Sequence, residues 1–313
     1  MSKLQITAVL CFAEISGMAA FASFPALVPS FLSEWGLSNT QAGWISGIYY
    51  AGYMLSAPIL TSLTDRVDPR RILLLGAGLS GTSALAYGLL ATGFWSALTF
   101  RFVAGMGLAG TFMPGLKLLS DHTEGPLQSR YLAFYTSSFS IGASASYLIS
   151  GEIAGALDWR WSFGLAAVGS LASATLIQTL LPPGRCHPES HPRMLLDFRP
   201  VLRSRPAMAY IVAYTGHAWE LFSFRSWIVA LLAFSQSLQV GGSLWNLTLI
   251  AAIVNLLGLP ASIGGNELAV RFGRRRVITL IMIVSFLVSC VAGFAVSSSV
   301  LIVMGLCVVY GVT

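Results

Sequence analysis

Charged residues are scarce in this chain of 313 residues. Only 10% of the sequence is Asp, Glu, Lys or Arg, while 55% is hydrophobic. A typical soluble domain carries about 25% charged residues. A chain this poor in charge would expose apolar patches to water that are larger than soluble monomers tolerate. The composition therefore excludes a soluble globular protein and indicates a protein whose surface faces lipid.

Cysteine is also sparse, and motifs that carry chemistry are missing. The four cysteines do not form the even, close spacing of a disulfide framework. The group Cys186, His187 and His191 matches no standard zinc pattern. Residues 76–81 and 105–110 match the dinucleotide fingerprint, but both lie inside apolar runs and neither follows a strand. We therefore expect no metal, no cofactor and no enzymatic activity.

Long apolar runs dominate the rest of the chain. A helix needs about 20 mainly apolar residues to span a bilayer, and residues 72–92 and 161–181 are runs of this length without any charge. The sequence predicts an all-α membrane protein with about ten transmembrane helices. The predicted spans are residues 5–29, 41–63, 72–92, 96–119, 130–153, 161–181, 206–235, 242–266, 277–296 and a last one from about 299.

The basic residues predict the orientation of these spans, because Lys and Arg collect in cytoplasmic loops. With the N-terminus inside, the inner segments hold fifteen of the Lys and Arg residues, and the outer loops hold only Arg160. Arg101 and Arg225 lie within predicted helices. This predicts a multi-pass protein of a bacterial inner membrane with a cytoplasmic N-terminus. It also accounts for the net charge of +6 without a nucleic-acid partner.

The chain contains an internal repeat. Residues 61–71 (TSLTDRVDPRR) resemble residues 266–275 (NELAVRFGRR), and both segments follow the second predicted helix of a half. We expect a six-helix N-terminal half at residues 1–181, a cytoplasmic linker at 182–205 and a partial C-terminal half at 206–313 with helices 7–10. A complete second half needs two more helices and the rest of a third, so we expect a chain truncated at its C-terminus.

Three motifs resemble the major facilitator superfamily. Residues 63–71, with Asp65 followed by paired arginines, resemble the family signature between helices 2 and 3. Residues 101–107 (RFVAGMG) resemble its helix 4 motif, and residues 158–163 (DWRWSF) resemble the start of its helix 6. With the repeat, the resemblance covers essentially the whole chain. It implies a bundle of two related halves that binds a small-molecule solute and acts as a monomer in the lipid bilayer.

The sequence departs from the family pattern at several positions. Thr61 and Asp68 stand where the signature has glycine, and Val270 stands where the second copy would have Asp. We therefore predict that Asp68 and Pro69 make the turn. The Gly-Pro motif of many drug antiporters is absent from helix 5, where residues 142–151 (GASASYLISG) stand instead.

The resemblance also implies a gate of charged residues at the inner helix ends. Asp65 would form a latch that holds one conformation and breaks during transport. The alternative is that these charges only set topology, since exposed ion pairs contribute about 0–1 kcal/mol. Lys117, near the inner end of helix 4, is interpreted as an anchor. The predicted gating residues are Asp65, Arg66, Arg70, Arg71, Arg271 and Arg274.

Acidic residues within the predicted helices are candidates for proton binding, because ionisable groups inside a membrane are costly and usually functional. Glu14 lies about ten residues, or ~15 Å, into the first helix. His217 and Glu220 are three residues apart and share one face of helix 7, the repeat counterpart of helix 1. Opposing carboxylates from the two halves would carry protons. The alternative is a static polar pair that bridges the halves.

Arginines and aromatic residues within the helices are candidates for solute binding. Arg101 and Arg225 would meet an anion, because the guanidinium presents a fork of donors. Arg101 is alternatively the structural and proton-relay arginine of the family, and Arg225 is alternatively an interface residue that extends toward water. Among the aromatic residues we expect Tyr50, Tyr53 and Trp219 to shape the pocket, with an interfacial belt as the alternative.

These features predict a secondary active transporter that moves a small anion or organic acid by alternating access, with proton symport. Two alternatives stay open. The first is a proton-driven exporter of drugs or metabolites with the same fold. The second is a membrane protein that does not transport, including an inactive remnant of a truncated gene.

Overall fold

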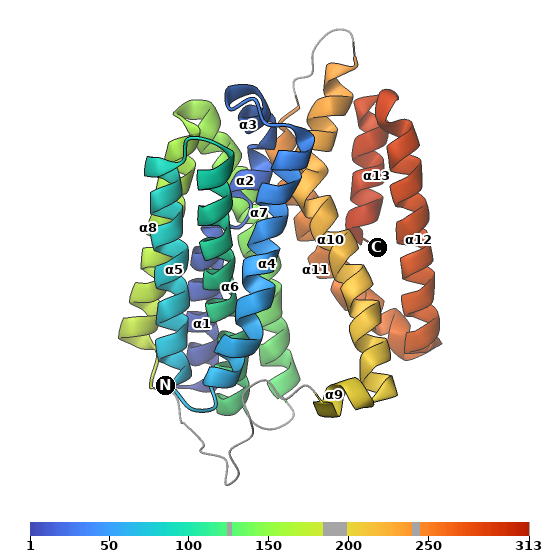
Figure 1. Cartoon of the computed structure of the whole chain (residues 1–313). Helices are drawn as coiled ribbons and strands as arrows, with labels where there is room; N and C mark the ends of the chain where they lie inside the picture. The colour runs from blue at the N-terminus through green and yellow to red at the C-terminus, as the bar shows by residue number, and fades with distance from the viewer. Residues whose placement is uncertain (124–126, 184–198, 240–244, 313) are drawn as a thin grey trace.

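The computed structural model describes residues 1–123, 127–183, 199–239 and 245–312, and this part of the chain is helical without strands (Figure 1). The first bundle contains α1 (Lys3–Gly17), η1 (Met18–Ala20), α2 (Ser23–Ala26), α3 (Val28–Glu34), α4 (Asn39–Leu63), α5 (Pro69–Leu90), α6 (Phe94–His122), α7 (Gln128–Ala156) and α8 (Trp159–Leu180). The short α9 (Arg199–Arg203) precedes the second bundle. That bundle contains α10 (Arg205–Ser237), α11 (Leu247–Phe272), α12 (Arg274–Phe294), η2 (Ala295–Ser297) and α13 (Val300–Val312).

The predicted spans coincide with these helices, so the all-α class is confirmed. The first span is divided into α1, η1, α2 and α3, and the others correspond to α4–α8 and α10–α13. Among the described helices, seven are long and apolar enough to cross a membrane. The long helices α4 and α7 are not among the seven, because residues such as Ser46, Ser138 and Ser146 on their buried faces lower the hydropathy. Most of the predicted linker at 182–205, including Cys186, His187 and His191, lies outside the described residues.

Local side chains determine where several helices begin. The Asp68 side chain accepts a hydrogen bond from the Arg70 backbone N–H at 2.9 Å, and Pro69 occupies the first turn of α5. Proline is well suited to this position, because its missing N–H has no helical partner there. The predicted Asp-Pro turn is therefore confirmed. Asp158 starts α8 in the same way through the Arg160 N–H.

The break in the first span is stabilised by other helices. Pro25 has no N–H, so it cannot bond the carbonyl of Phe21 one turn earlier. Ser146 of α7 bonds the interrupted backbone twice, donating to the Ala19 carbonyl at 2.6 Å and accepting from the Ala22 N–H at 3.0 Å. A backbone break inside a membrane is tolerated only where neighbouring helices supply such partners. The serine-rich face of α7 therefore stabilises the broken first span.

Glycines allow close helix packing in the first bundle. A Cβ on Gly105 of α6 would overlap the Tyr49 carbonyl of α4, and a Cβ on Gly76 of α5 would overlap the backbone of Gly110. Small residues at such crossings let two helix backbones approach closely. Gly76, Gly105, Gly107 and Gly110, which match a dinucleotide fingerprint in the sequence, therefore serve helix packing.

The two bundles meet along a seam of α2, α3 and α7 against α10 and α11. We call the end of the molecule with the N-terminus and α9 the linker end, and the end with α3 the far end (Figure 1).

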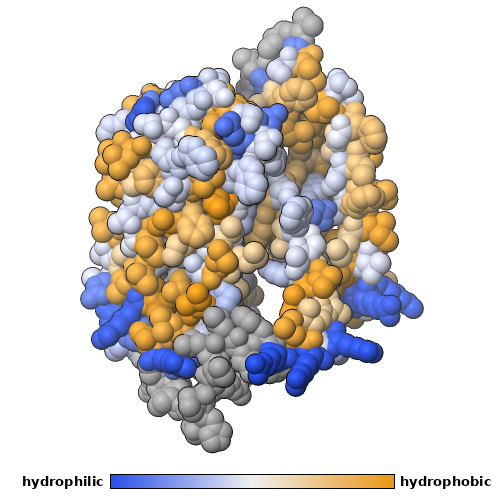
Figure 2. All heavy atoms as spheres, in the orientation of Figure 1, coloured by the Kyte–Doolittle hydropathy of each residue, from blue (hydrophilic) through white to orange (hydrophobic). Residues whose placement is uncertain are grey.

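At the far end, the Asn246 side chain donates to Glu152, and Gly151 contacts Thr248 too closely to carry a Cβ. Toward the linker end, residues 209–217 of α10 are all exposed, and Figure 2 shows an opening between the bundles. The structure is therefore closed at the far end and open toward the linker end.

Candidate functional site

Glu14 is a buried carboxyl group in the middle of the first bundle. Its side chain is on α1 and is 4% exposed. The Tyr135 hydroxyl lies 3.3 Å from Glu14 Oε2, whereas Oε1 has no hydrogen-bond partner. No cation among the described residues pairs with Glu14. The structure therefore places a buried acid on α1 that no described cation neutralises.

Arg101 of α6 reaches the break in the first span. Its guanidinium donates to the Ala20 and Phe21 carbonyls, at 3.4 Å each, and lies 4.1 Å from the ring centroid of Tyr49. The Phe21 carbonyl is the group that Pro25 leaves without a helical donor. The Nε of Arg101 has no hydrogen-bond partner among the described residues. These contacts favour the structural interpretation of Arg101, with unused donor capacity on the guanidinium.

Arg225 of α10 lies at the seam between the bundles and is 8% exposed. Its guanidinium carbon lies 5.8 Å from the ring of Phe139 on α7 and 5.9 Å from the ring of Phe222 on its own helix. Among the described residues, no carboxylate or other acceptor bonds this guanidinium. Tyr147 of α7 donates to the Arg225 backbone carbonyl, which fixes this turn of α10 against the first bundle. The seam therefore holds a buried positive charge that no described residue neutralises.

The candidate aromatic residues divide between the seam and exposed surfaces. The Tyr50 ring of α4 lies 4.6 Å from the Phe222 ring, so Tyr50 spans the seam next to Arg225. Tyr53, one turn further along α4, packs against the same cluster of hydrophobic side chains. Trp219 of α10 is 78% exposed and does not join this packing. Tyr50 therefore lies near Arg225 at the seam, whereas Trp219 lies on an exposed surface of α10.

Glu220 lies in a polar cluster within the second bundle. The hydroxyl of Ser285 on α12 donates to Glu220 Oε1, and Tyr310 of α13 lies beside the same carboxyl group. Glu14 has its contacts in the first bundle and Glu220 in the second, so the structure does not bring the two carboxyls into contact. His217 is exposed on α10.

The predicted gate lies at the linker end. Lys117 of α6 forms an ion pair with Asp65 at 2.8 Å, and it also lies 3.9 Å from Asp121. Lys117 Nζ also donates to the Thr64 carbonyl at 3.4 Å. Asp65 therefore pairs within the first bundle with Lys117, which we interpreted from the sequence only as an anchor. No sequence signal pairs positions 65 and 117.

The predicted arginines of the gate have separate environments. Arg70 donates to the Gln178 carbonyl of α8, and Arg271 pairs with Glu267 one turn earlier on α11 at 2.8 Å. Arg66, Arg71 and Arg274 are exposed near the same helix ends. The printed bonds of Arg70 and Arg271 each stay within one bundle.

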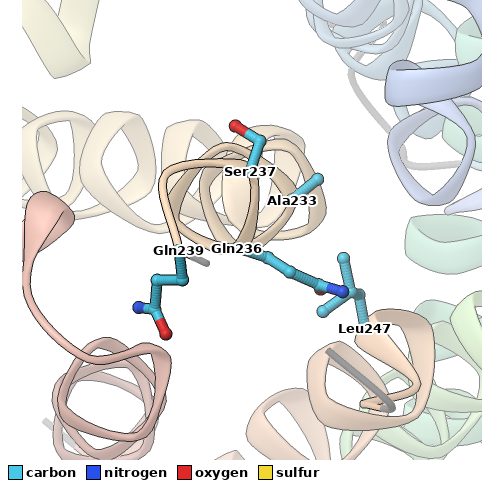
Figure 3. A pocket seen from close by; sticks show the side chains of 5 residues that line it. All are labelled: Ala233, Gln236, Ser237, Gln239 and Leu247. Carbon is cyan, nitrogen blue, oxygen red and sulfur yellow. The ribbon is translucent and has the colours of Figure 1, made fainter. Parts of the chain in front are cut away.

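A separate hollow of about 470 Å³ lies between the end of α10 and the start of α11. In Figure 3, Gln236 points from α10 toward Leu247 of α11, while Gln239 points to another side. The remaining lining residues are Ala233 and Ser237. The hollow is open, and none of the described residues that line it is charged or is a predicted site residue.

Comparisons with known proteins give a consistent result. The family model described as Major Facilitator Superfamily matches residues 9–313. Protein spinster of Drosophila melanogaster is 23% identical over 265 residues, which cover 80% of this chain and 44% of that protein. A probable sphingolipid transporter, spinster homolog 2 of Arabidopsis thaliana, is 29% identical over 144 residues, which cover 46% of this chain and 29% of that protein. The chain thus spans less than half the length of these curated relatives.

Solved structures share the fold. A bacterial homolog of the human lysosomal transporter spinster, in an inward-facing and occupied conformation, superposes with a TM-score of 0.71 at 18% identity, covering 99% of this chain and 71% of that chain. The xylose transporter XylE from E. coli, in an inward open conformation, superposes with a TM-score of 0.67 at 15% identity, covering 99% of this chain and 79% of that chain.

Proposed function

The chain belongs to the major facilitator superfamily, and from this premise we propose that it moves a small anion or organic acid across a membrane by alternating access, coupled to a proton. Two related bundles that rock about a site between them are the physical basis of this mechanism. The bundles touch at the far end and open toward the linker end, which is the arrangement of one of the two access states.

The observation that carries the proposal is Arg225. A buried guanidinium without a neutralising partner costs folding free energy, so a bound anion would relieve this cost. Arg225 lies at the seam, where rocking of the bundles would expose it to one side at a time. Its planar fork of donors suits a carboxylate or phosphate, and Tyr50, Phe139 and Phe222 would enclose the rest of a small organic acid.

Glu14 is the proposed proton carrier of the first bundle. As a carboxylate it would be a buried charge without an ion-pair partner, which is unfavourable. Binding and release of a proton at this site would therefore be coupled to a change in the surroundings of Glu14. Glu220 accepts a hydrogen bond from Ser285 in the second bundle and is the second candidate carrier. The N-terminus and the linker end would face the cytoplasm of a bacterial cell.

The test uses purified protein in liposomes with an imposed pH gradient and a panel of labelled organic acids, inorganic anions and cations. We expect uptake of one anion class, lost in Arg225→Gln and retained in the exposed control Arg160→Gln. The Glu14→Gln/Glu220→Gln pair should remove the response to the pH gradient. Uptake limited to cations would contradict the anion proposal, and efflux driven by inward proton flow would favour the exporter alternative. Absence of any flux would favour a protein that does not transport.

A second candidate solute is an amphipathic anion with a longer apolar part. The Phe139 and Phe222 rings near Arg225 would accept an apolar group next to the anionic one. The relative from Arabidopsis thaliana is described as a probable sphingolipid transporter. Competition of long-chain and short-chain acids for uptake would decide between the two solute classes.

A further inference from the structure

Tyr135 joins the buried carboxyl group of Glu14 to helix α6. It lies on α7 and is fully buried. Its hydroxyl oxygen lies 3.3 Å from Glu14 Oε2 on α1, 3.3 Å from the Thr111 carbonyl and 3.2 Å from the Phe112 carbonyl on α6. A phenol has one hydrogen, so it can donate to only one of these three acceptors at a time.

From this geometry we infer that Tyr135 is a hydrogen-bond switch that reports the protonation state of Glu14 to the backbone of α6. When Glu14 is neutral, its O–H donates to the Tyr135 oxygen, and Tyr135 donates to a carbonyl of α6. When Glu14 loses its proton, Tyr135 turns its hydrogen toward Glu14 Oε2, and the α6 carbonyl loses a donor. The step breaks only the O–H bond of Glu14, and in a pH titration the released proton passes to solvent water.

The part of α6 that Tyr135 contacts is already weakened. Pro114 lies inside α6, where it removes one backbone N–H from the helical ladder. The next residue is Gly115, and a Cβ there would overlap the Tyr135 hydroxyl. Tyr135 therefore fits against α6 only because residue 115 has no side chain. A change of one hydrogen bond has more effect at such a point than in an unbroken helix.

The same helix carries Arg101 and Lys117. Arg101 bonds the break in the first span toward the far end, and Lys117 pairs with Asp65 at the linker end. A bend of α6 at Pro114 would therefore move Arg101 and Lys117 relative to each other. Tyr135 is a positioning residue in this scheme, because it acts on α6 and does not carry the transported proton itself.

The groups that face Glu14 are few. Among the described residues, the titratable groups near Glu14 are Cys11 on its own helix, Tyr49 and Tyr53 on α4, and Tyr135 on α7. Among the described residues of α6 and α8, no charged side chain pairs with Glu14. Tyr135 is the neighbour with a hydroxyl at hydrogen-bond distance from the carboxyl group.

The test measures the carboxyl C=O stretching band of Glu14 by infrared spectroscopy of the purified chain in liposomes across a pH series. Loss of the band in Glu14→Gln assigns it. We expect Tyr135→Phe to shift both the band frequency and the pH at which the band titrates. The matched control is Tyr131→Phe, one turn earlier on α7, which should change neither. Gly115→Ala should reproduce the Tyr135→Phe shift, because its added methyl group displaces the hydroxyl.

An unchanged band in Tyr135→Phe, or an equal shift in Tyr131→Phe, would overturn the inference. The role of the switch in transport rests on the proposed function, whereas the infrared result does not require transport. If the band shifts as expected while Glu14→Gln keeps normal proton-driven uptake, the switch stands and proton coupling through Glu14 fails. If Tyr135→Phe does not fold, Gly115→Ala provides the same comparison.

Discussion

At the scale of single residues, the structure separates the two intramembrane arginines. Arg101 has backbone carbonyls to bond at the break in the first span, whereas Arg225 has aromatic rings and no acceptor among the described residues. A buried cation that bonds carbonyls is largely satisfied, and one that touches only rings is not. The two residues look alike in the sequence, but their surroundings favour a structural role for Arg101 and a binding role for Arg225.

This difference gives a prediction for Arg225. Loss of one charge-assisted hydrogen bond costs about 1.5–3 kcal/mol, so Arg225→Gln should weaken binding of the transported anion by about 10-fold to 100-fold. Arg225→Lys should recover part of this loss, since it keeps the charge and loses the fork. Anion binding to purified protein, followed by quenching of tryptophan fluorescence, measures the effect. An affinity equal to that of the unmodified chain would remove Arg225 from the site.

At the scale of helices, close approach is achieved by glycine at defined positions. Gly105 of α6 contacts the Tyr49 carbonyl of α4, while Gly155 near the end of α7 has open space around it. Both are helical glycines and cannot be distinguished by composition. In a membrane, small residues let backbones pack without a hydrophobic driving force between helices.

We predict opposite effects of alanine at these two glycines. Gly105→Ala should lower the free energy of unfolding by about 1–3 kcal/mol, because α4 must move away from α6. Gly155→Ala should be neutral or slightly stabilising, because alanine favours helix more than glycine does. Thermal melting in detergent, followed by tryptophan fluorescence, measures both. Equal melting temperatures for the two variants would contradict the packing assignment.

At the scale of the whole molecule, the two bundles are connected at the far end and separated toward the linker end. The ion pair of Lys117 with Asp65 lies at the open end and inside one bundle. An exposed pair of this kind contributes little to stability. It holds Asp65 against α6 of the first bundle.

Chemical cross-linking would test the closure at the far end. In a chain with its own cysteines replaced, we expect the pair Glu152→Cys/Asn246→Cys to be joined efficiently by a short bifunctional thiol reagent, because these side chains are hydrogen-bonded across the seam. A locked far end should then stop alternating access. Failure of the cross-link in the absence of solute would contradict the described arrangement, and a cross-linked protein with full uptake would contradict the rocking mechanism.

The orientation in the membrane gives a further prediction. Leu157 before α8 and Leu202 in α9 are similarly exposed, at 65% and 63%. Cysteines introduced at these two positions should react with an impermeant thiol reagent from opposite sides of the membrane, with Leu202→Cys labelled only from the cytoplasm. Labelling of both from one side would exclude the predicted succession of spans.

Much of this protein follows from the sequence alone. The spans and their ends are local properties, because hydropathy acts over about 20 residues and a cap such as Asp68 acts on the next turn. The depth of Glu14 also follows, since a helix rises a fixed distance per residue. The class, the number of predicted spans and several candidate residues could therefore be derived without coordinates.

Only the tertiary structure decided which of these residues meet. Tyr135 with Glu14, and Lys117 with Asp65, join positions 121 and 52 residues apart, and no local pattern connects them. Such pairs depend on how closely and at what rotation two helices cross, which is set by missing side chains at residues such as Gly115 and by the break at Pro25. Local interactions determine where the helices begin and end. The packing of the helices determines which side chains meet, because a hydrogen bond or ion pair acts over only a few ångströms of space whatever the distance along the chain.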